Sequence, residues 1–334
     1  MTLTQVTESE RSAPKRWSMS GLSPFATVFG MAIVVVGVGV ARPRFLTAAN
    51  LEIVFMDAAV LVVLAVGLTL VMSMKGIDLS VAAAADLAGY VAAIVLLDGG
   101  GVFAAIGFAL LVGISSGLIS GLLSGYLGVP AIVATLAMNL LLTAAAVVIS
   151  SNSTPKQLFT ASGSLVGDFL AIGSDALGPV KYLIIIAIFV VVAGWFASRR
   201  TVWGRQIDLV ESSARAAFLA GIPVRATFTA GFVASGLLAA VAGLMLTART
   251  GVAVPGSAEP LLLSAFTAVY IGSVASPKGR IAVLWTVVGA VFVSLLSNGL
   301  ILLGLGAPWR TGLNGALILL ALALGTLRRR GTRS

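Results

Sequence analysis

The chain has 334 residues, of which 59% are hydrophobic and only 10% are charged, and its formal net charge is +9. A soluble domain carries about 25% charged residues, so this composition excludes a soluble globular enzyme and equally a disordered or fibrous chain. Cysteine and histidine are absent, which removes disulfides, thiolate chemistry and the commonest general base and zinc ligand. The sequence therefore predicts an all-α integral membrane protein without catalytic residues, metal site or cofactor of its own.

Ten apolar segments come close to the roughly 20 residues that cross a bilayer as a helix. In chain order they are residues 24–41, 57–74, 81–97, 102–124, 130–150, 180–198, 226–247, 261–274, 281–303 and 310–327. The eighth segment is short and is expected to be broken or re-entrant, so nine or eleven spans are the alternatives. Polar stretches between the segments are too short for a catalytic or nucleotide-binding domain.

The basic residues predict how these segments are oriented. If residue 1 lies in the cytoplasm and ten spans follow, fifteen of the 21 Lys and Arg residues lie on the cytoplasmic side. This excess is typical of cytoplasmic loops, so both termini are expected there. Residues 1–23 are predicted to be a disordered cytoplasmic segment, 24–327 the transmembrane domain and 328–334 a basic tail. The first segment exceeds the 7–15 apolar residues of a signal peptide, so we expect it to be retained.

A glycine stripe marks the fourth segment. Gly113, Gly117, Gly121 and Gly125 recur every four residues and so line one narrow face of a helix, where another backbone can approach closely. The pattern predicts tight packing within the subunit, and an interface that moves during gating is the alternative.

Acidic residues inside apolar segments are costly and usually functional. The candidates here are Asp57, Asp78, Asp86 and Glu259. Asp78 follows Gly76 and directly precedes an apolar helix, so it is either an ordinary N-cap or part of a transport pathway. Asp86 lies eight residues later, about two helical turns on the same face, and is expected to point into an aqueous cavity. Asp57 is expected to be solvated at the end of its span.

Residues 199–225 form the longest basic segment between two spans. Gly204 is expected to break the preceding structure, and Ser212 or Ser213 to cap a short helix that runs through Ala220. Gly221 and Pro223 then end that helix. The segment is either a plain connector or a peg that docks into the groove of a partner.

No lysine follows the phosphate-loop pattern, in which Lys is preceded by Gly and followed by Ser or Thr. If transport is driven by ATP, another subunit must therefore bind and hydrolyse it.

Six segments in order resemble the permease subunits of bacterial ABC importers for ribose, xylose and related simple sugars, in the branched-chain amino acid/ribose permease superfamily. They are Phe45-Leu46-Thr47 with Asn50-Leu51, residues 76–81 (GIDLSV), Val129-Pro130 with residues 132–136, Gly204-Arg205 with residues 216–222, Lys278-Gly279-Arg280, and residues 298–304. The resemblance covers about residues 45–327. Lys75 and Ala82 stand where the family normally has glycines around its Asp-Leu-Ser motif.

The resemblance implies the partners and the mechanism. A second permease, identical or related, would complete the pathway, a periplasmic or lipid-anchored binding protein would deliver the sugar, and a cytoplasmic ATPase would use ATP and Mg. The implied location is the bacterial inner membrane, with no nucleic-acid partner. The implied coupling residues are Gly204, Arg205, Glu211, Ser213, Ala216, Ala217 and Gly221.

Four polar residues are the candidates for the sugar pathway: Asp78, Asp86, Asn139 and Asn298. Carboxylates and carboxamides can hydrogen-bond sugar hydroxyls, whereas Asn139 and Asn298 can equally bond across helices. An importer permease needs only to let the sugar pass, so a tight site is not required.

Two other classes of protein compete with the importer permease. A secondary transporter driven by protons or sodium often has two corresponding broken helices; one Gly-interrupted break is present at 75–80, with an ambiguous counterpart at 272–280. An intramembrane enzyme would lack histidine, cysteine and clustered carboxylates for its chemistry.

Overall fold

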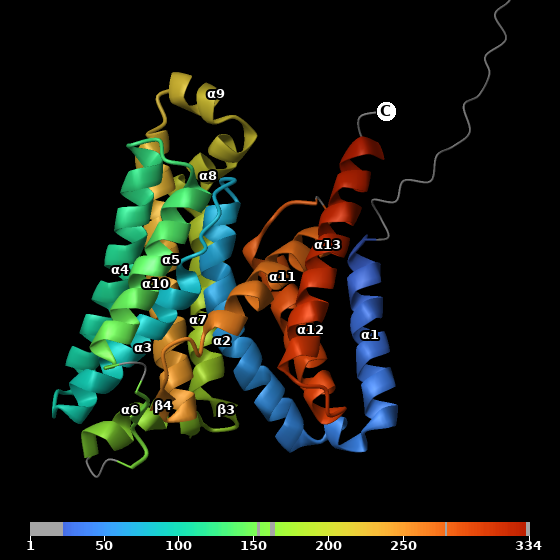
Figure 1. The fold of residues 1–334 in the computed structure, drawn as a ribbon. Helices are drawn as coiled ribbons and strands as arrows, with labels where there is room; N and C mark the ends of the chain where they lie inside the picture. Colours follow the sequence, from blue (N-terminus) through green and yellow to red (C-terminus); the bar gives the residue numbers. More distant parts are fainter. Residues whose placement is uncertain (1–22, 152–153, 161–163, 278, 332–334) are drawn as a thin grey trace, which may run out of the picture.

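The computed structural model of the protein describes residues 23–151, 154–160, 164–277 and 279–331. The predicted N-terminal segment lies outside the described residues up to residue 22, as does the end of the predicted basic tail, residues 332–334. The described chain forms a helical bundle (Figure 1), with α8 and α9 at one end and α6 and the short strands at the other. We refer to these as the α9 end and the β3 end.

The helices follow one another with short connections. They are α1 (Ser23–Ala41), the 3-10 helix η2 (Pro43–Leu46), α2 (Ala48–Met72), α3 (Val81–Leu97), α4 (Val102–Gly125), α5 (Ala131–Ile149), α6 (Ser164–Ser174), α7 (Tyr182–Arg200), α8 (Val202–Ser212), α9 (Ala214–Leu219), α10 (Val224–Thr250), α11 (Glu259–Ala275), α12 (Val283–Leu302) and α13 (Ala307–Gly331). Two antiparallel pairs of two-residue strands join loops: β1 (Lys156–Gln157) with β4 (Val252–Ala253), and β2 (Ala176–Leu177) with β3 (Val180–Lys181).

Each of the ten predicted segments coincides with one of these helices. Among the described residues, seven helices are long and apolar enough to cross a membrane, namely α2, α4, α5, α7, α10, α12 and α13. The described part of α1, together with α3 and α11, forms shorter apolar helices. The chain is thus a multi-pass, all-α membrane protein, and the number of ten spans stays a prediction. The eighth segment is α11, a continuous helix of 17 residues, so the prediction of a broken helix there is wrong, whereas a re-entrant helix stays a prediction.

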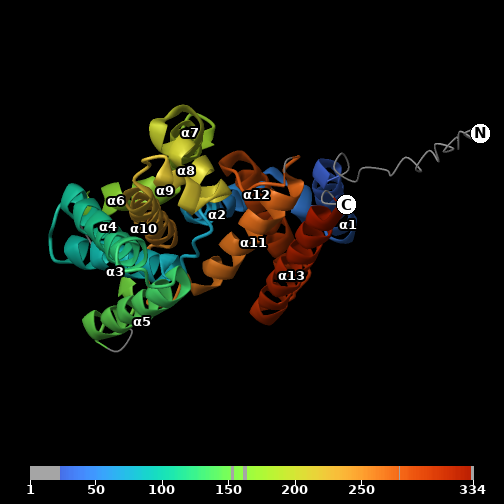
Figure 2. The ribbon, with the colours of Figure 1, turned by 90° about the horizontal axis from the view of Figure 1, so that it is seen from above.

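Helix α2 joins the two halves of the bundle. It packs against α7 and α10 on one side and against α11 and α12 on the other. Figure 2, seen from above, places α3, α4, α5 and α10 in one half and α11, α12 and α13 in the other. Helices α5 and α13 project toward the same side of the molecule, with α3 and α11 behind them.

The glycine stripe of α4 lies against α10. A Cβ atom at Gly113 or Gly117 would collide with a carbonyl oxygen of α10, and one at Gly121 or Gly125 would press on Thr229. Gly236 of α10 faces Gly113 in return. The two backbones are therefore in direct contact, the arrangement that small residues permit in membrane helices.

The beginning of α2 differs from the sequence-based prediction. The helix starts at Ala48, nine residues before the predicted position 57. Thr47 accepts a hydrogen bond from the Asn50 backbone N–H, which caps the helix. Glu52 and Asp57, the charges that shortened the predicted segment, both form ion pairs with residues from later in the chain. Asp57 is exposed, as expected for a solvated residue, and in addition it is paired with Arg249.

Candidate functional site

Asp78 lies in the irregular segment between α2 and α3. Its Oδ1 accepts hydrogen bonds from the Ser80 backbone N–H at 3.0 Å and the Ser80 hydroxyl at 2.6 Å, and its Oδ2 accepts one from the Ser235 hydroxyl of α10 at 2.9 Å. The N-cap position of α3 is Ser80, not Asp78, so the N-cap interpretation is wrong. Asp78 instead binds the irregular segment before α3 to α10 through Ser235. Its side chain is buried.

Backbone conformation explains why the chain breaks before α3. Lys75 has φ = 63°, in the left-handed region, and Gly76 packs with its Cα against Val71 and Phe228. A left-handed residue ends a helix, and glycine adopts that conformation with the least strain. Lys75 stands where the permease family that the sequence resembles normally has glycine. Its side chain is exposed.

Asp86 lies in the second turn of α3 and holds the start of α11. Its Oδ1 accepts hydrogen bonds from the Ser257 hydroxyl at 2.9 Å and the Ala258 backbone N–H at 2.8 Å. Ala258 is the N-cap of α11 and makes no side-chain capping bond, so Asp86 supplies an acceptor from another helix. Because α3 begins only at Val81, Asp78 and Asp86 do not share a helix face, and that prediction is wrong.

The two candidate asparagines have different surroundings. Asn298 is buried on α12 and exchanges hydrogen bonds with Asn50 of α2, at 2.9 and 3.2 Å. Asn50 also donates to the Phe45 carbonyl oxygen at 2.9 Å. Asn139 is half-buried on α5. The four candidates therefore do not converge on one site: Asp78 lies in the segment before α3, against α10, Asp86 at the start of α11, Asn139 on α5 and Asn298 at the α2–α12 contact.

Thr135 and Thr143 were missed by the sequence-based reasoning. With Asn139 they recur every four residues on α5, so they lie along one side of the helix. Thr135 donates a hydrogen bond to the Ile77 carbonyl oxygen beside Asp78, and Thr143 lines a cavity together with Asp86. The period of four within an otherwise apolar helix was the signal that would have identified this polar edge.

The predicted coupling segment forms two helices. Thr201 caps α8 by accepting a hydrogen bond from the Gly204 N–H at 3.2 Å, so the chain breaks at Thr201. Gly204 lies inside the first turn of α8, and the prediction of a break at Gly204 is wrong. Glycine is required there because a Cβ would collide with the Ser198 carbonyl oxygen at the end of α7.

Helix α9 begins and ends close to the residues that were predicted to start and stop it. The Ser213 hydroxyl accepts a hydrogen bond from the Ala216 N–H at 3.2 Å and caps the helix. Gly221 has φ = 78° just beyond its end. Arg205 on α8 and Ala216 on α9 are exposed, Glu211 is half-buried, and Ala217 is buried.

Two large apolar side chains of α9 are unusually exposed. Phe218 is 66% and Leu219 77% exposed, and α9 forms the extreme tip of its end of the bundle (Figure 1). The other side of this segment is anchored, because Ile207, Val210 and Ala217 form a small core with Met74 from the end of α2. The tip is thus a firmly held surface with an apolar patch.

A second cavity, of about 340 Å³, lies beside α8. The charged side chains that line it are Arg199, Asp208, Glu211 and Arg280. They come from the end of α7, from α8 and from the loop before α12. This cavity therefore lies between α8, in the segment that carries α9, and the half of the bundle that contains α12.

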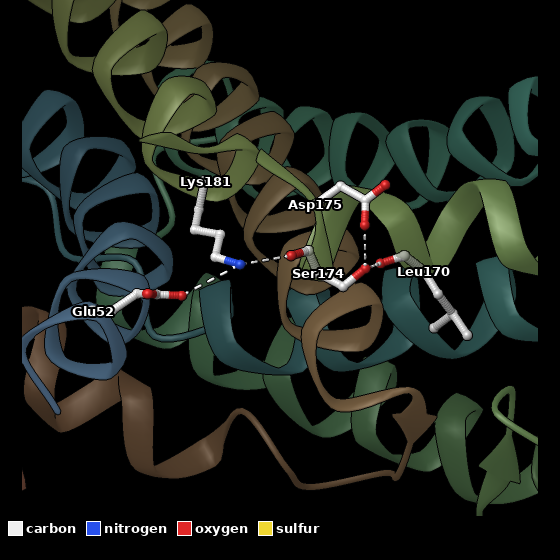
Figure 3. A network of polar contacts seen from close by, with 5 residues as sticks. All are labelled: Glu52, Leu170, Ser174, Asp175 and Lys181. Carbon is white, nitrogen blue, oxygen red and sulfur yellow. Dashed lines mark hydrogen bonds and ion pairs between the residues drawn. The ribbon is translucent and has the colours of Figure 1, made fainter. Parts of the chain in front are cut away.

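At the β3 end, ion pairs hold the first part of α2. Lys181 Nζ lies 3.3 Å from Glu52 Oε1 and donates to the Ser174 carbonyl oxygen at 2.9 Å; Figure 3 shows Lys181 between these two groups. The Ser174 hydroxyl in turn donates to Asp175 Oδ1 at 2.9 Å. With the Asp57–Arg249 pair, these contacts link α2 to α6, β3 and α10.

Comparison with known proteins places these features in a family. A model described as the permease component of the branched-chain amino acid transport system matches residues 50–322. The ribose import permease protein of Escherichia coli K12 is 33% identical over 320 residues, covering 95% of this chain and 97% of that protein. The D-allose transport system permease protein of the same strain is 30% identical over 330 residues, or 98% of this chain and 99% of the relative. The fructose import permease protein of Rhizobium meliloti is 28% identical over 293 residues, or 84% and 79%.

Proposed function

The chain belongs to the permease-component family of branched-chain amino acid transport systems, and we propose that it forms the membrane pathway of an ATP-driven importer for a small sugar. The observation that carries the proposal is the match to the ribose import permease over nearly the full length of both chains. The ion-coupled secondary transporter is the alternative that this match disfavours.

The proposed substrate is a sugar or sugar-like solute. The three relatives described above are named for ribose, D-allose and fructose, which share a chain of hydroxyl groups. The side chains on α3 and α5 are suited to such a solute, because carboxylate, carboxamide and hydroxyl groups all exchange hydrogen bonds with hydroxyls. We assign the pathway to Asp86 and Asn139, whereas the hydrogen bonds of Asp78 and Asn298 to neighbouring helices favour a role in holding the bundle together.

The ATPase is proposed to bind at the α9 end. Phe218 and Leu219 are exposed apolar side chains, and such a patch is suited to binding a partner protein. The small core around Ala217 packs α9 against the end of α2 and the start of α10, so a displacement of α9 would be transmitted to both helices. Gly204, Arg205, Glu211, Ser213, Ala216 and Gly221 complete the proposed coupling segment. ATP and Mg belong to that partner.

The remaining partners follow from the same arrangement. A second permease, identical or related, would lie against this one in the membrane, and a periplasmic or lipid-anchored sugar-binding protein would dock at the β3 end. With ten spans, both termini would be cytoplasmic and the chain would reside in the bacterial inner membrane. The excess of Lys and Arg on the α9 side of the predicted spans supports this orientation.

Co-purification tests the assembly. The tagged chain is extracted from native membranes in mild detergent, and bound proteins are identified by mass spectrometry. We expect an ATPase with phosphate-loop motifs, and any second permease would establish the pairing. Recovery of the chain by itself, together with uptake into liposomes under an ion gradient without ATP, would instead establish a secondary transporter.

A substitution tests the docking surface. Phe218→Ser removes an exposed ring from α9 without touching the buried core, so we expect the co-purified ATPase to fall at least about tenfold, since an apolar anchor at an interface contributes about 1–2 kcal/mol or more. Ser212→Ala on α8, an exposed position, is the matched control and should retain the ATPase. Equal recovery from both variants would count against α9 as the docking element.

A further inference from the structure

A cavity of about 410 Å³ lies between the two halves of the bundle. Ala83 and Asp86 of α3 form one wall, and Glu259 with the turn before α11 forms a second. The third wall is α5, which contributes Thr143, Ala146 and Val147. Three helices thus line this partly open cavity, and α5, one of them, projects to one side of the molecule (Figure 2).

The polar groups of the walls are placed for hydrogen bonding rather than for packing. Asp86 is only 8% exposed; its Oδ1 accepts from the Ser257 hydroxyl and the Ala258 N–H, and the Gly256 backbone N–H is a further donor to the carboxylate. Glu259 is exposed and, among the described residues, has no ion-pair partner. An ionised carboxylate has about four acceptor sites, so three donors leave Asp86 with some acceptor capacity and Glu259 keeps more.

Thr143 is the unusual wall residue. A threonine in an apolar helix commonly donates to the carbonyl four residues earlier, as Thr135 of the same helix does to Ala131 at 2.8 Å. Among the described residues, neither the hydroxyl of Thr143 nor the carboxamide of Asn139 makes a hydrogen bond to the protein. Polar groups left open inside a membrane helix bundle mark a pathway or a binding site.

We propose that this cavity, bounded by Asp86, Thr143 and Glu259, is a transit subsite for one monosaccharide-sized polyol, with Asn139 one turn along α5 as the next contact. The inference rests on the proposed function and names the part of the pathway where the sugar pauses. Sugar hydroxyls donate to the two carboxylates and accept from the Thr143 hydroxyl. The volume lies near the lower end of the roughly 300–1,000 Å³ of small-molecule sites, which suits a single sugar unit.

A cation is the competing occupant, and two observations disfavour it. Among the described residues, no group of three or more acidic side chains is arranged to hold a metal ion. In addition, the cavity lies at the N-terminal end of α11, where the helix dipole places partial positive charge. Neither observation disfavours a neutral solute with many hydroxyl groups.

Cysteine accessibility tests the subsite directly, because the natural chain has no cysteine. The Thr143→Cys variant of the full chain, in membrane vesicles, is treated with a hydrophilic maleimide, with and without D-ribose, D-allose or D-fructose. We expect labelling, and a slowing of about tenfold by at least one sugar at roughly ten times its Kd. Val148→Cys is the control: it lies five residues along α5, is 78% exposed and does not line the cavity, so sugar should leave its labelling rate unchanged.

Each other result overturns the proposal. If Thr143→Cys is not labelled, the cavity is closed to water, and if none of the three sugars slows its labelling, the cavity does not hold them. Slowing by sodium chloride relative to choline chloride, without an effect of sugar, would identify a cation site. Should Thr143→Cys fail to accumulate, Glu259→Cys provides the same test from the opposite wall, where the side chain is exposed.

A steric block gives a second, independent measurement. Val147→Phe fills the cavity from α5. We expect it to lower at least tenfold the uptake, by the co-expressed importer, of the sugar that slows Thr143→Cys labelling. Val148→Phe should leave that uptake unchanged. Equal uptake by both variants would overturn the subsite. The labelling experiment does not need the ATPase, so failure to assemble an importer and failure of the cavity to hold sugar give different results.

Discussion

The α4–α10 contact and the polar edge of α5 are two ways of using an apolar helix. Along α4, four glycines bring two backbones together, and no space is left between the helices. Along α5, a residue every fourth position is polar instead of small, and the helix borders a cavity. The same four-residue spacing thus produces a closed interface along α4, whereas along α5 it runs from buried Thr135, which bonds to the Ile77 carbonyl oxygen, to Thr143, which borders the cavity. The first holds two helices together, and the second borders the proposed sugar pathway.

The largest effect is expected at the closed interface. Gly117→Leu places a side chain on the Phe232 carbonyl oxygen of α10, and overpacking of this kind costs about 3 kcal/mol or more. We expect most of the variant to be lost as aggregate in size-exclusion chromatography. Gly107→Leu, in the same helix but with open space around its Cα, should elute like the natural protein. If Gly117→Leu also did so, the backbones could not be in contact.

A smaller loss of stability is expected at the hydrogen-bonded pair of Asn50 on α2 and Asn298 on α12. Asn298→Leu leaves Asn50 buried with one partner fewer, and an interhelical hydrogen bond of this kind contributes about 1–2 kcal/mol at most. We expect a lower melting temperature in detergent.

The double variant Asn50→Leu/Asn298→Leu refines this expectation. Because it removes both polar groups, it should recover part of the loss. Additive losses would indicate that the pair of asparagines is not coupled.

The break before α3 offers a stabilising change. Lys75 holds a left-handed backbone conformation, which costs a residue other than glycine roughly 1–2 kcal/mol. Lys75→Gly should therefore raise stability by about 1 kcal/mol, less the entropy that glycine adds to the unfolded chain. Thermal unfolding in detergent measures the gain. Lys75→Ala, which retains the strain, is the control, and an equal rise in both would assign the effect to the lost charge.

The smallest effect on stability is expected on the open helix. Asn139 makes no hydrogen bond to the protein among the described residues, so Asn139→Leu should change the melting temperature little, within about 0.5 kcal/mol. Sugar uptake should nevertheless fall, since Asn139 is the next contact of the proposed pathway. A stability loss as large as that of Asn298→Leu would instead assign Asn139 a structural role and remove it from the pathway.

Much of the fold was predictable because its physical cause is local. An apolar run that must satisfy its backbone inside a membrane forms a helix, so all ten predicted segments became helices. The exceptions have particular reasons. α2 begins early because Thr47 caps it at Ala48, and Glu52 and Asp57 are accommodated as ion pairs with Lys181 and Arg249. α6 was not predicted because its 11 residues are fewer than the roughly 20 that cross a bilayer.

The candidate site was predictable only in part. Acidic residues in apolar segments identified Asp86, and punctuation by Ser213 and Gly221 located α9. The hydrophobic pattern says nothing about whether a polar side chain faces another helix or a cavity, so Asn298 and Asn139 looked alike, and Thr143 was overlooked. Gly204 was misassigned because glycine ends helices and also permits close contact, and the sequence does not distinguish these two uses.

The sequence by itself determined the membrane environment, the positions of the helices, the absence of a phosphate loop and the resemblance to importer permeases, since each depends on composition or on residues close together in the chain. Only the tertiary structure decided which polar groups meet: Asp86 with the start of α11, 171 and 172 residues away, and Asn50 with Asn298, 248 residues away. Such pairs form because a buried polar group without a hydrogen bond is costly, and which partner it finds depends on how helices distant in the chain are packed together.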